Sequence, residues 1–152
     1  MSDNNRKFLI FTLQSSLYAL DLAHIAEVSD PPRLCPIPRA PSCFSGAMNY
    51  HGDIVAVMNL SIFLGIPGCN QPGKLIVLHH EVASLAFLVE SVVRIIAEAE
   101  VSFSPTTENG FAAALLNFSD GKATLLDLEA LVISAGICMQ GNHTAANIFF
   151  TG

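Results

Sequence analysis

His51 is the residue of this chain whose surroundings most resemble a catalytic centre. It stands beside Asn49 and Tyr50 in the stretch GAMNYHGDIVAVMNL, residues 46–60. A histidine can take the proton of a nearby thiol, so a spatial meeting of His51 with Cys43 would suit a small hydrolase. His51 can equally form the tip of a turn, because a glycine follows it. Turns carry contact sites, so we interpret His51 as a surface residue used for contact, with catalysis as the alternative.

The run His79-His80-Glu81 suggests a metal site, because imidazole and carboxylate groups are common zinc ligands. These residues end the apolar stretch KLIVLHH, which predicts a strand. Neighbouring side chains on a strand point to opposite faces, so both histidines could bind one ion only if a turn distorted the chain. The four cysteines lack C-x-x-C spacing and are interpreted as free thiols packed as small hydrophobes. We therefore expect no metal site and no catalytic residue, although a metal- or Cys/His-dependent hydrolase remains the alternative function.

The stretch GCNQPGK, residues 68–74, has the glycine and lysine spacing of a phosphate-binding loop. Leu75 stands where that motif needs Ser or Thr, and the motif needs a helix after it, whereas a strand is predicted here. Asp127 and Glu129 form a carboxylate pair, but two residues apart on a helix they do not face each other. They suit the first turn of that helix instead. No cofactor is expected.

Composition and charge limit the kinds of protein and partner that this chain can represent. The 152 residues are 51% hydrophobic and 13% charged, which is enough for one domain or for two small halves that share a core. The net charge is −6 and the seven lysines and arginines are scattered, so nucleic acid is not an expected partner. No apolar run approaches the roughly 18 residues that span a bilayer, and the polar start MSDNNRK lacks a signal-peptide pattern. The expected location is the cytoplasm, without membrane insertion.

Short strands must position these residues. KFLIFTL at 7–13 is apolar at odd and even positions, as in a strand buried on both faces, and it begins a hairpin predicted over 7–22. Residues 24–28 predict a helical turn, and the prolines of 29–45 predict a loop. Further strands are predicted at 46–50, 53–58, 74–80, 85–90, 111–118 and 123–126.

Two capped helices follow strand pairs. Asn59 begins the helix LSIFL, and Asp127 begins DLEALVISA, which Gly136 is expected to end. One apolar stripe of the second helix must be buried, and it consists of Leu128, Leu131, Val132 and Ala135.

The two halves of the chain follow one plan, namely strand, turn, strand, loop, strand, glycine turn, strand and capped helix. Landmarks recur 67 to 69 residues apart: Phe8 with Leu75, Tyr18 with Phe87, Gly52 with Gly121, and Asn59 with Asp127. This spacing suggests two similar β units. Short antiparallel strands in this number usually close into small barrels, which removes exposed sheet edges.

FTLQSSLYALDLAHIAEV combines an apolar hairpin with the element I-x-E-V. The stretch IPRAPSCFSGAMNYHGDIVAVMNL follows, and then LIVL, LAFLVESV and TLLDLEALV. In this order, these stretches resemble the CheW-like family of chemotaxis coupling proteins. The resemblance covers residues 7–135 and leaves 136–152 as a C-terminal tail.

The resemblance implies an all-β fold with short helices, made of two small five-stranded SH3-like β-barrels packed together. Within the single 7–135 domain, the barrel halves are expected at roughly 15–75 and 76–125, with exchange of end strands left open. It implies no catalysis. It implies an adaptor that couples chemoreceptors to a CheA-type histidine kinase in membrane-associated receptor arrays.

By this resemblance the partners are the kinase's CheW-like regulatory domain and the cytoplasmic hairpin tip of a chemoreceptor. Receptor contact is expected near Ile25 and Glu27 and in the groove between the barrels. The kinase-coupling surface is expected at the turn formed by Asn49, Tyr50, His51 and Gly52, which Gly46 precedes. Where the family usually has Leu-Arg, this chain has Tyr50-His51, which replaces a permanent charge by a short titrating side chain.

Overall fold

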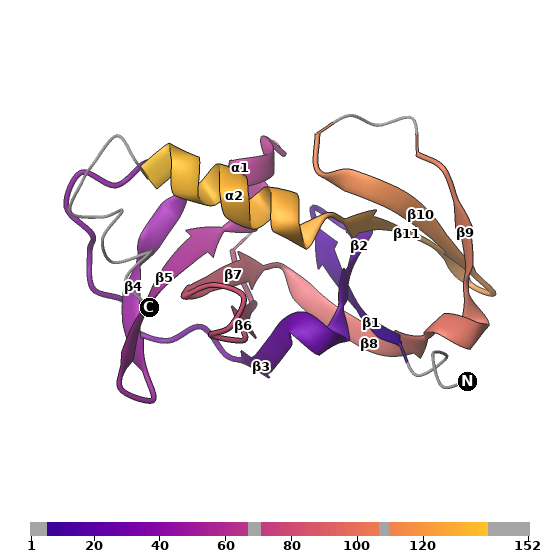
Figure 1. The fold of residues 1–152 in the computed structure, drawn as a ribbon, viewed down its shortest axis with the longest axis horizontal. Coiled ribbons are helices and arrows are strands. Elements are labelled where there is room, and N and C mark those ends of the chain that lie inside the picture. The colour runs from indigo at the N-terminus through magenta and orange to yellow at the C-terminus, as the bar shows by residue number, and fades with distance from the viewer. Residues whose placement is uncertain (1–5, 67–70, 107–109, 140–152) are drawn as a thin grey trace.

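The computed structural model describes residues 6–66, 71–106 and 110–139, and within these ranges the chain is mostly β-strand (Figure 1). Two helices and two short 3-10 segments accompany the strands. The strands are β1 (Lys7–Leu13), β2 (Ser16–Asp21), β3 (Ile25–Ser29), β4 (Phe44–Tyr50), β5 (Asp53–Asn59), β6 (Lys74–Leu78), β7 (Leu85–Val89), β8 (Ser91–Ala97), β9 (Ser102–Ser104), β10 (Ala112–Phe118) and β11 (Gly121–Leu126). The helical segments are η2 (Leu22–His24), α1 (Leu60–Leu64), η3 (Glu98–Glu100) and α2 (Leu128–Met139).

The strands form two sheets, which Figure 1 shows as two adjoining lobes. One sheet has the order β8-β1-β2-β11-β10-β9 and the other the order β3-β6-β7-β5-β4. The predicted class, mostly β with short helices in two strand units, is confirmed. No ladder among the described residues joins the first and last strands of either sheet. Along the chain, the five-stranded sheet takes residues 25–89 and the other takes 7–21 and 91–126, which differs from a division at 15–75 and 76–125.

The two sheets contain one topology built twice, with the hairpins exchanged. The predicted repeat relates β1, β2, β4 and β5 to β6, β7, β10 and β11, and the structure adds one further strand to each half, β3 and β8. Applying this correspondence to the order β3-β6-β7-β5-β4 gives β8-β1-β2-β11-β10, which is the order observed in the other sheet. The first hairpin of each half therefore pairs in the sheet formed by the other half. The parallel pairs β2–β11 and β5–β7 connect each exchanged hairpin to the strands of the other half.

Three apolar clusters follow from this exchange. One face of the five-stranded sheet buries Val57, Val77 and Leu88, and one face of the six-stranded sheet buries Phe8, Ile10 and Leu116. The opposite faces meet in a larger central cluster with α2. The expected burial of β1 on both faces is confirmed, because Phe8 and Ile10 lie in one cluster and Leu9 and Phe11 in the central one.

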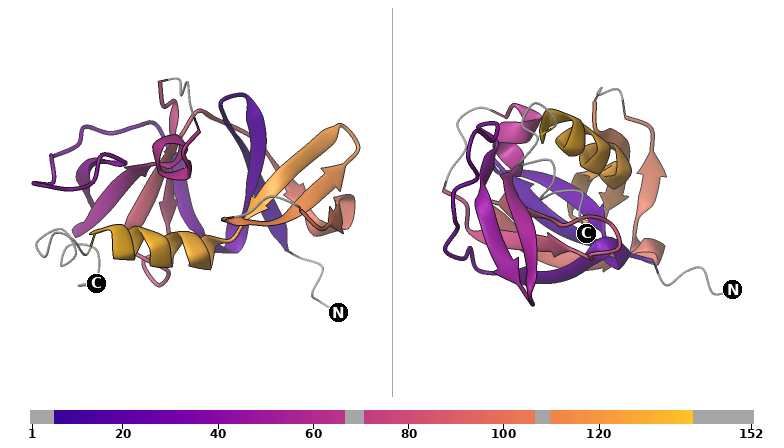
Figure 2. Two further views of the ribbon diagram at one scale, coloured as in Figure 1. Left: turned by 90° about the horizontal axis from the view of Figure 1, so that it is seen from above. Right: turned by 60° about the vertical axis from the view of Figure 1, so that its left-hand side comes forward.

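Helix α2 lies across the central cluster and is longer than predicted (Figures 1 and 2). The expected stripe is confirmed, with Leu131 and Ala135 fully buried. The expected end at Gly136 is wrong, since the helix continues to Met139. Met139 extends the stripe by four residues and is fully buried. Its burial outweighs the cost of a glycine inside a helix, about 1 kcal/mol. Of the predicted tail, residues 140–152 lie outside the described residues.

Two further local predictions need correction. Residues 25–29 form a strand rather than a helical turn. The helical turn lies just before this strand, at Leu22–His24. Antiparallel pairing of β3 with β6, for example of Glu27 with Val77, fixes the extended backbone. His79 and His80 follow β6 instead of ending it, because the His79 carbonyl accepts a 2.9 Å hydrogen bond from the Val82 N–H and closes a turn. No helix in the described part of the chain is long and apolar enough to cross a bilayer.

Candidate partner-binding surface

The turn between β4 and β5 presents His51 at its tip. His51 and Gly52 have φ values of 52° and 92°, and Tyr50 pairs with Asp53 across the turn. A two-residue hairpin with two left-handed residues matches the twist of the strands. The Asn49 side chain supports the turn, since its Oδ1 accepts a 3.1 Å hydrogen bond from the Gly52 N–H. The imidazole of His51 is exposed and packs edge-on against the Tyr50 ring, with centroids 4.3 Å apart.

Tyr50 joins this turn to a distant strand. Its hydroxyl donates a 2.8 Å hydrogen bond to Oε1 of Glu27 on β3. Its ring is half-buried and packs on the cluster formed by one face of the five-stranded sheet. The hydrogen bond to Glu27, followed by desolvation and the Glu27 charge, raises the pKa of Tyr50 above its usual value of 10.0. Because β3 and β4 are the two end strands of the sheet order, the sheet must curve until its ends approach.

Of the seven residues predicted for contact, five lie on this surface and two lie beneath it. We define the turn surface as Glu27, Asn49, Tyr50, His51 and Gly52, which the structure brings together. Ile25 and Gly46 are buried and support the two strands instead.

Gly46 has a structural requirement for glycine. Its φ is +149°, and an added Cβ would lie 2.7 Å from the Cys35 carbonyl oxygen and 2.9 Å from Cβ of Leu34. The chain approaches so closely because Cys35 and Ala47 exchange two backbone hydrogen bonds of 2.8 and 2.7 Å. Gly46 therefore lets the proline-rich loop dock against β4, which positions the strand that ends at the turn.

A small pocket of about 140 Å³ adjoins the turn surface. It gathers three histidines, His51, His79 and His80, with Asp53 and Tyr50. Sequence analysis treated His51 apart from the pair His79 and His80, and the fold brings all three to one pocket. Within the described ranges, no group of three or more His, Cys, Asp or Glu side chains is arranged to hold a metal ion.

Cys43 and His51 do not meet. The whole of β4, Phe44–Tyr50, separates them along one strand, which at roughly 3.4 Å per residue is more than about 20 Å. Cys43 is buried in the central cluster, whereas His51 is exposed at the far end of the strand. Cys43 and His51 therefore cannot form the thiol–imidazole pair that was considered for a small hydrolase.

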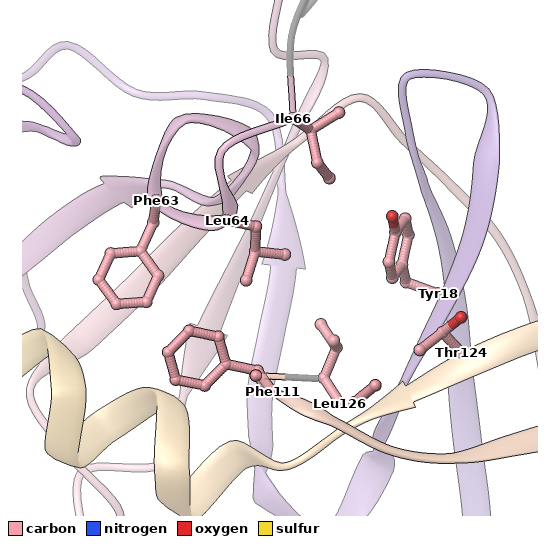
Figure 3. A pocket seen from close by; sticks show the side chains of 9 residues that line it. Tyr18, Phe63, Leu64, Ile66, Phe111, Thr124 and Leu126 are labelled. Atoms are coloured by element: carbon pink, nitrogen blue, oxygen red, sulfur yellow. The ribbon is translucent and has the colours of Figure 1, made fainter. Parts of the chain in front are cut away.

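A second pocket, of about 350 Å³, is lined by α1 and Ile66 and by residues of β2, β10 and β11 of the six-stranded sheet. Figure 3 shows Phe63 and Phe111 at one end and Tyr18 and Thr124 at the other, with Leu126 between them. The two phenylalanine rings pack with centroids 5.5 Å apart. The predicted receptor contact in a groove between the two β units stays a prediction.

Exposed apolar side chains on β3 and β8 were missed by sequence analysis. Val28 is 37% exposed on β3, and Val93 and Ile95 are 50% and 51% exposed on β8. These two strands correspond in the duplicated topology, and each begins its sheet. Figure 1 shows both along the lower side of the molecule. We call these three residues the β3/β8 patch. The repeat could not have pointed to it, because residues 24–28 were predicted as a helical turn and no strand was predicted over 91–97.

This arrangement defines a class: a mostly β protein whose two sheets exchange their hairpins. The family model of the CheW-like domain matches residues 7–135, and the chain belongs to that family. The crystal structure of scaffolding protein TtCheW from Thermoanaerobacter tengcongensis has a similar fold, with a TM-score of 0.68 at 21% identity. The alignment covers 80% of this chain and 88% of that one. Comparison with curated proteins finds no match.

Proposed function

We propose that this chain is a non-enzymatic scaffold that couples chemoreceptors to a CheA-type histidine kinase. The family match supports this function, because it spans every strand of both sheets and most of α2. The observation that carries the proposal is the turn surface. There, an exposed tip is held by two side-chain hydrogen bonds on a buried strand pair. A surface fixed in this way binds without first having to be ordered, which lowers the entropic cost of association.

On the kinase side, the turn surface receives the CheW-like regulatory domain of the kinase. Tyr50 and His51 offer two rings with little conformational freedom, a property common in energetically important interface residues. Glu27 adds a negative charge beside Tyr50. Asn49 and Gly52 fix the backbone of the turn through their hydrogen bond. A short polar turn of this kind suits docking onto another β unit.

On the receptor side, the β3/β8 patch receives the helical hairpin tip. Val93 and Ile95 lie two residues apart on β8 and Val28 lies on β3, and an amphipathic helix binds exposed apolar side chains of this kind through residues spaced three and four apart. Ile25, which is buried on the same strand as Val28, holds β3 in place, and Glu27 belongs to the turn surface although it lies on that strand too. The protein acts at the cytoplasmic side of membrane-associated receptor arrays and needs no cofactor.

Two binding assays on matched variants test this function. Binding is measured by biolayer interferometry against the kinase regulatory domain and against a receptor hairpin fragment from the same organism. His51→Glu is expected to weaken kinase binding at least tenfold and to leave receptor binding unchanged. Ile95→Asp is expected to show the reverse pattern. Ile133→Asp, on the exposed face of α2, is the control and should change neither. If both partners bind all three variants like the wild type, with matching circular dichroism, the proposed surfaces are wrong.

A further inference from the structure

The pocket of Figure 3 has two walls, which different parts of the fold hold in place. One wall is α1 with Ile66, and α1 contacts β5 and β7 of the five-stranded sheet. At the end of α1, the Gly65 N–H donates a 3.1 Å hydrogen bond to the Ile62 carbonyl. The Ile66 N–H donates a 2.9 Å bond to the Ser61 carbonyl. With a φ of 75° at Gly65, these two bonds form the Schellman end of a helix, so Ile66 is fixed although it lies outside the helix.

The other wall belongs to the six-stranded sheet. Tyr18 on β2 pairs with Thr124 on β11 in the parallel ladder, which places these two residues side by side. Phe111 precedes β10, and its carbonyl accepts a 2.8 Å hydrogen bond from the Asp127 N–H, so the chain before β10 is tied to the start of α2. The rings of Phe111 and Phe63 pack with centroids 5.5 Å apart, and this pair joins the two walls at one end of the pocket (Figure 3).

The lining of this pocket indicates which chemical class of ligand it suits. Aromatic and aliphatic side chains form most of it, and the hydroxyls of Tyr18 and Thr124 are the polar side-chain groups among its described residues. No charged side chain of the described ranges lines the pocket, so an ionised ligand would lose its hydration without gaining a partner. Phe63 and Phe111 are half-buried, so the pocket reaches solvent and a ligand that enters it covers apolar surface.

We propose that this pocket binds a small neutral aromatic molecule that carries one hydrogen-bonding group. Ligand pockets in proteins have volumes from about 300 Å³ upward, a mostly apolar lining and a few polar groups. An apolar cavity of about 150 Å³ holds one benzene ring, so the 350 Å³ of this pocket has room for two fused rings. The ligand rings pack on Phe63 and Phe111, and the polar group meets the hydroxyls of Tyr18 and Thr124. This inference goes beyond the proposed scaffold function and does not depend on it.

The test titrates 2-naphthol, a neutral two-ring molecule with one hydroxyl, into the full chain. Its fluorescence can be excited beyond the absorption of tyrosine, and the chain has no tryptophan. We expect one site with a dissociation constant below about 1 mM. Nuclear Overhauser contacts should join the ligand to Phe63, Phe111 and Leu126. 2-Naphthoate has a similar shape but is ionised at neutral pH, and it should bind at least about tenfold more weakly.

Matched variants locate the ligand. Ala112 lines the pocket, so Ala112→Leu should fill part of it and weaken 2-naphthol binding at least about tenfold. Ala113, the next residue on β10, lines a different pocket, and Ala113→Leu is the control that should bind like the wild type. The double variant Tyr18→Phe, Thr124→Val removes both hydroxyls with little change of shape and should weaken binding about threefold or more.

The inference is overturned if 2-naphthol does not bind at concentrations up to about 1 mM, or if 2-naphthoate binds equally well. Wild-type affinity in Ala112→Leu or in the double variant, with matching circular dichroism, also overturns it. If Ala112→Leu does not fold, the double variant and the Overhauser contacts decide. Displacement of 2-naphthol by the receptor hairpin fragment would assign the pocket to receptor contact and overturn the inference as well.

Discussion

The hydroxyl of Tyr50 donates a 2.8 Å hydrogen bond to Glu27, so the end of β4 is tied to β3 at the opposite end of the sheet order. This bond joins two regions that sequence analysis assigned to different partners. A change at Glu27 should therefore affect Tyr50 without altering the backbone of the His51–Gly52 turn. The bond also offers a direct spectroscopic measurement, because the chain has two tyrosines and no tryptophan.

The first prediction concerns the ionisation of Tyr50. In a Tyr18→Phe background, ultraviolet absorbance reports only Tyr50, and its phenolate should form above the usual value of 10.0 because Glu27 raises its pKa. Glu27→Gln should bring the midpoint down towards 10. Since the folded-state pKa is raised, this contact stabilises the fold fully below pH 10, and the contribution is lost as the pH rises through the folded-state pKa. Equal midpoints in both proteins would show that the bond does not form in solution.

The second prediction compares two glycines. Gly46→Ala should destabilise the fold by more than about 1 kcal/mol, because its Cβ would meet the Cys35 carbonyl oxygen at 2.7 Å in addition to the strain of a positive φ. Gly52→Ala is the matched control, since a Cβ there meets nothing within 4 Å and only backbone strain remains. Urea unfolding measures both free energies. A smaller loss for Gly46→Ala than for Gly52→Ala would contradict the close docking of the loop on β4.

The third prediction concerns the cap of α1. Asn59 Oδ1 accepts a 3.2 Å hydrogen bond from the Ile62 N–H, so Asn59→Ala should cost about 1 kcal/mol of unfolding free energy. Asn59→Asp keeps the acceptor and should retain stability within about 0.5 kcal/mol. Chemical denaturation at neutral pH tests the pair. Equal losses for the two variants would mean that the cap does not contribute.

The fourth prediction concerns the stripe of α2. Leu131 is fully buried in the central cluster, so Leu131→Ala should destabilise by about 2–4 kcal/mol. Ile133→Ala, on the exposed face of the same helix, should change stability by less than about 0.5 kcal/mol. A loss below about 0.5 kcal/mol for Leu131→Ala would show that α2 does not pack on the sheets as described.

Local patterns predicted most strands of this fold within one or two residues. KFLIFTL is apolar at odd and even positions and LAFLV is apolar throughout, and the structure buries β1 and β7 on both faces. The helix caps were equally predictable, because Asn59 and Asp127 each accept a hydrogen bond from the backbone N–H three residues later. Such features depend only on neighbours in the sequence.

The exchange of hairpins could not be predicted in the same way. It depends on parallel pairs such as Tyr18 with Thr124, whose residues are distant in the sequence and leave no local pattern. The direction of Ile25 was missed for a related reason. A register shift between Ile25 and Glu27 turns the first side chain into the core and leaves the second exposed.

The turn surface was predicted in part. The His51–Gly52 turn follows from residue types alone, and Asn49 at its start is a common supporter of such turns. The proximity of His79 and His80 to that turn depends on how β6 and β5 lie in the sheet. Sequence analysis therefore identified the turn tip but not the residues that surround it.

Bridging is the most direct test of the proposed scaffold. A receptor hairpin fragment is immobilised, and retention of the kinase regulatory domain is measured with and without this chain at saturating concentration. We expect retention only when the chain is present, and its loss with either His51→Glu or Ile95→Asp. Retention that is the same with and without the chain, or that both variants support fully, would contradict the account.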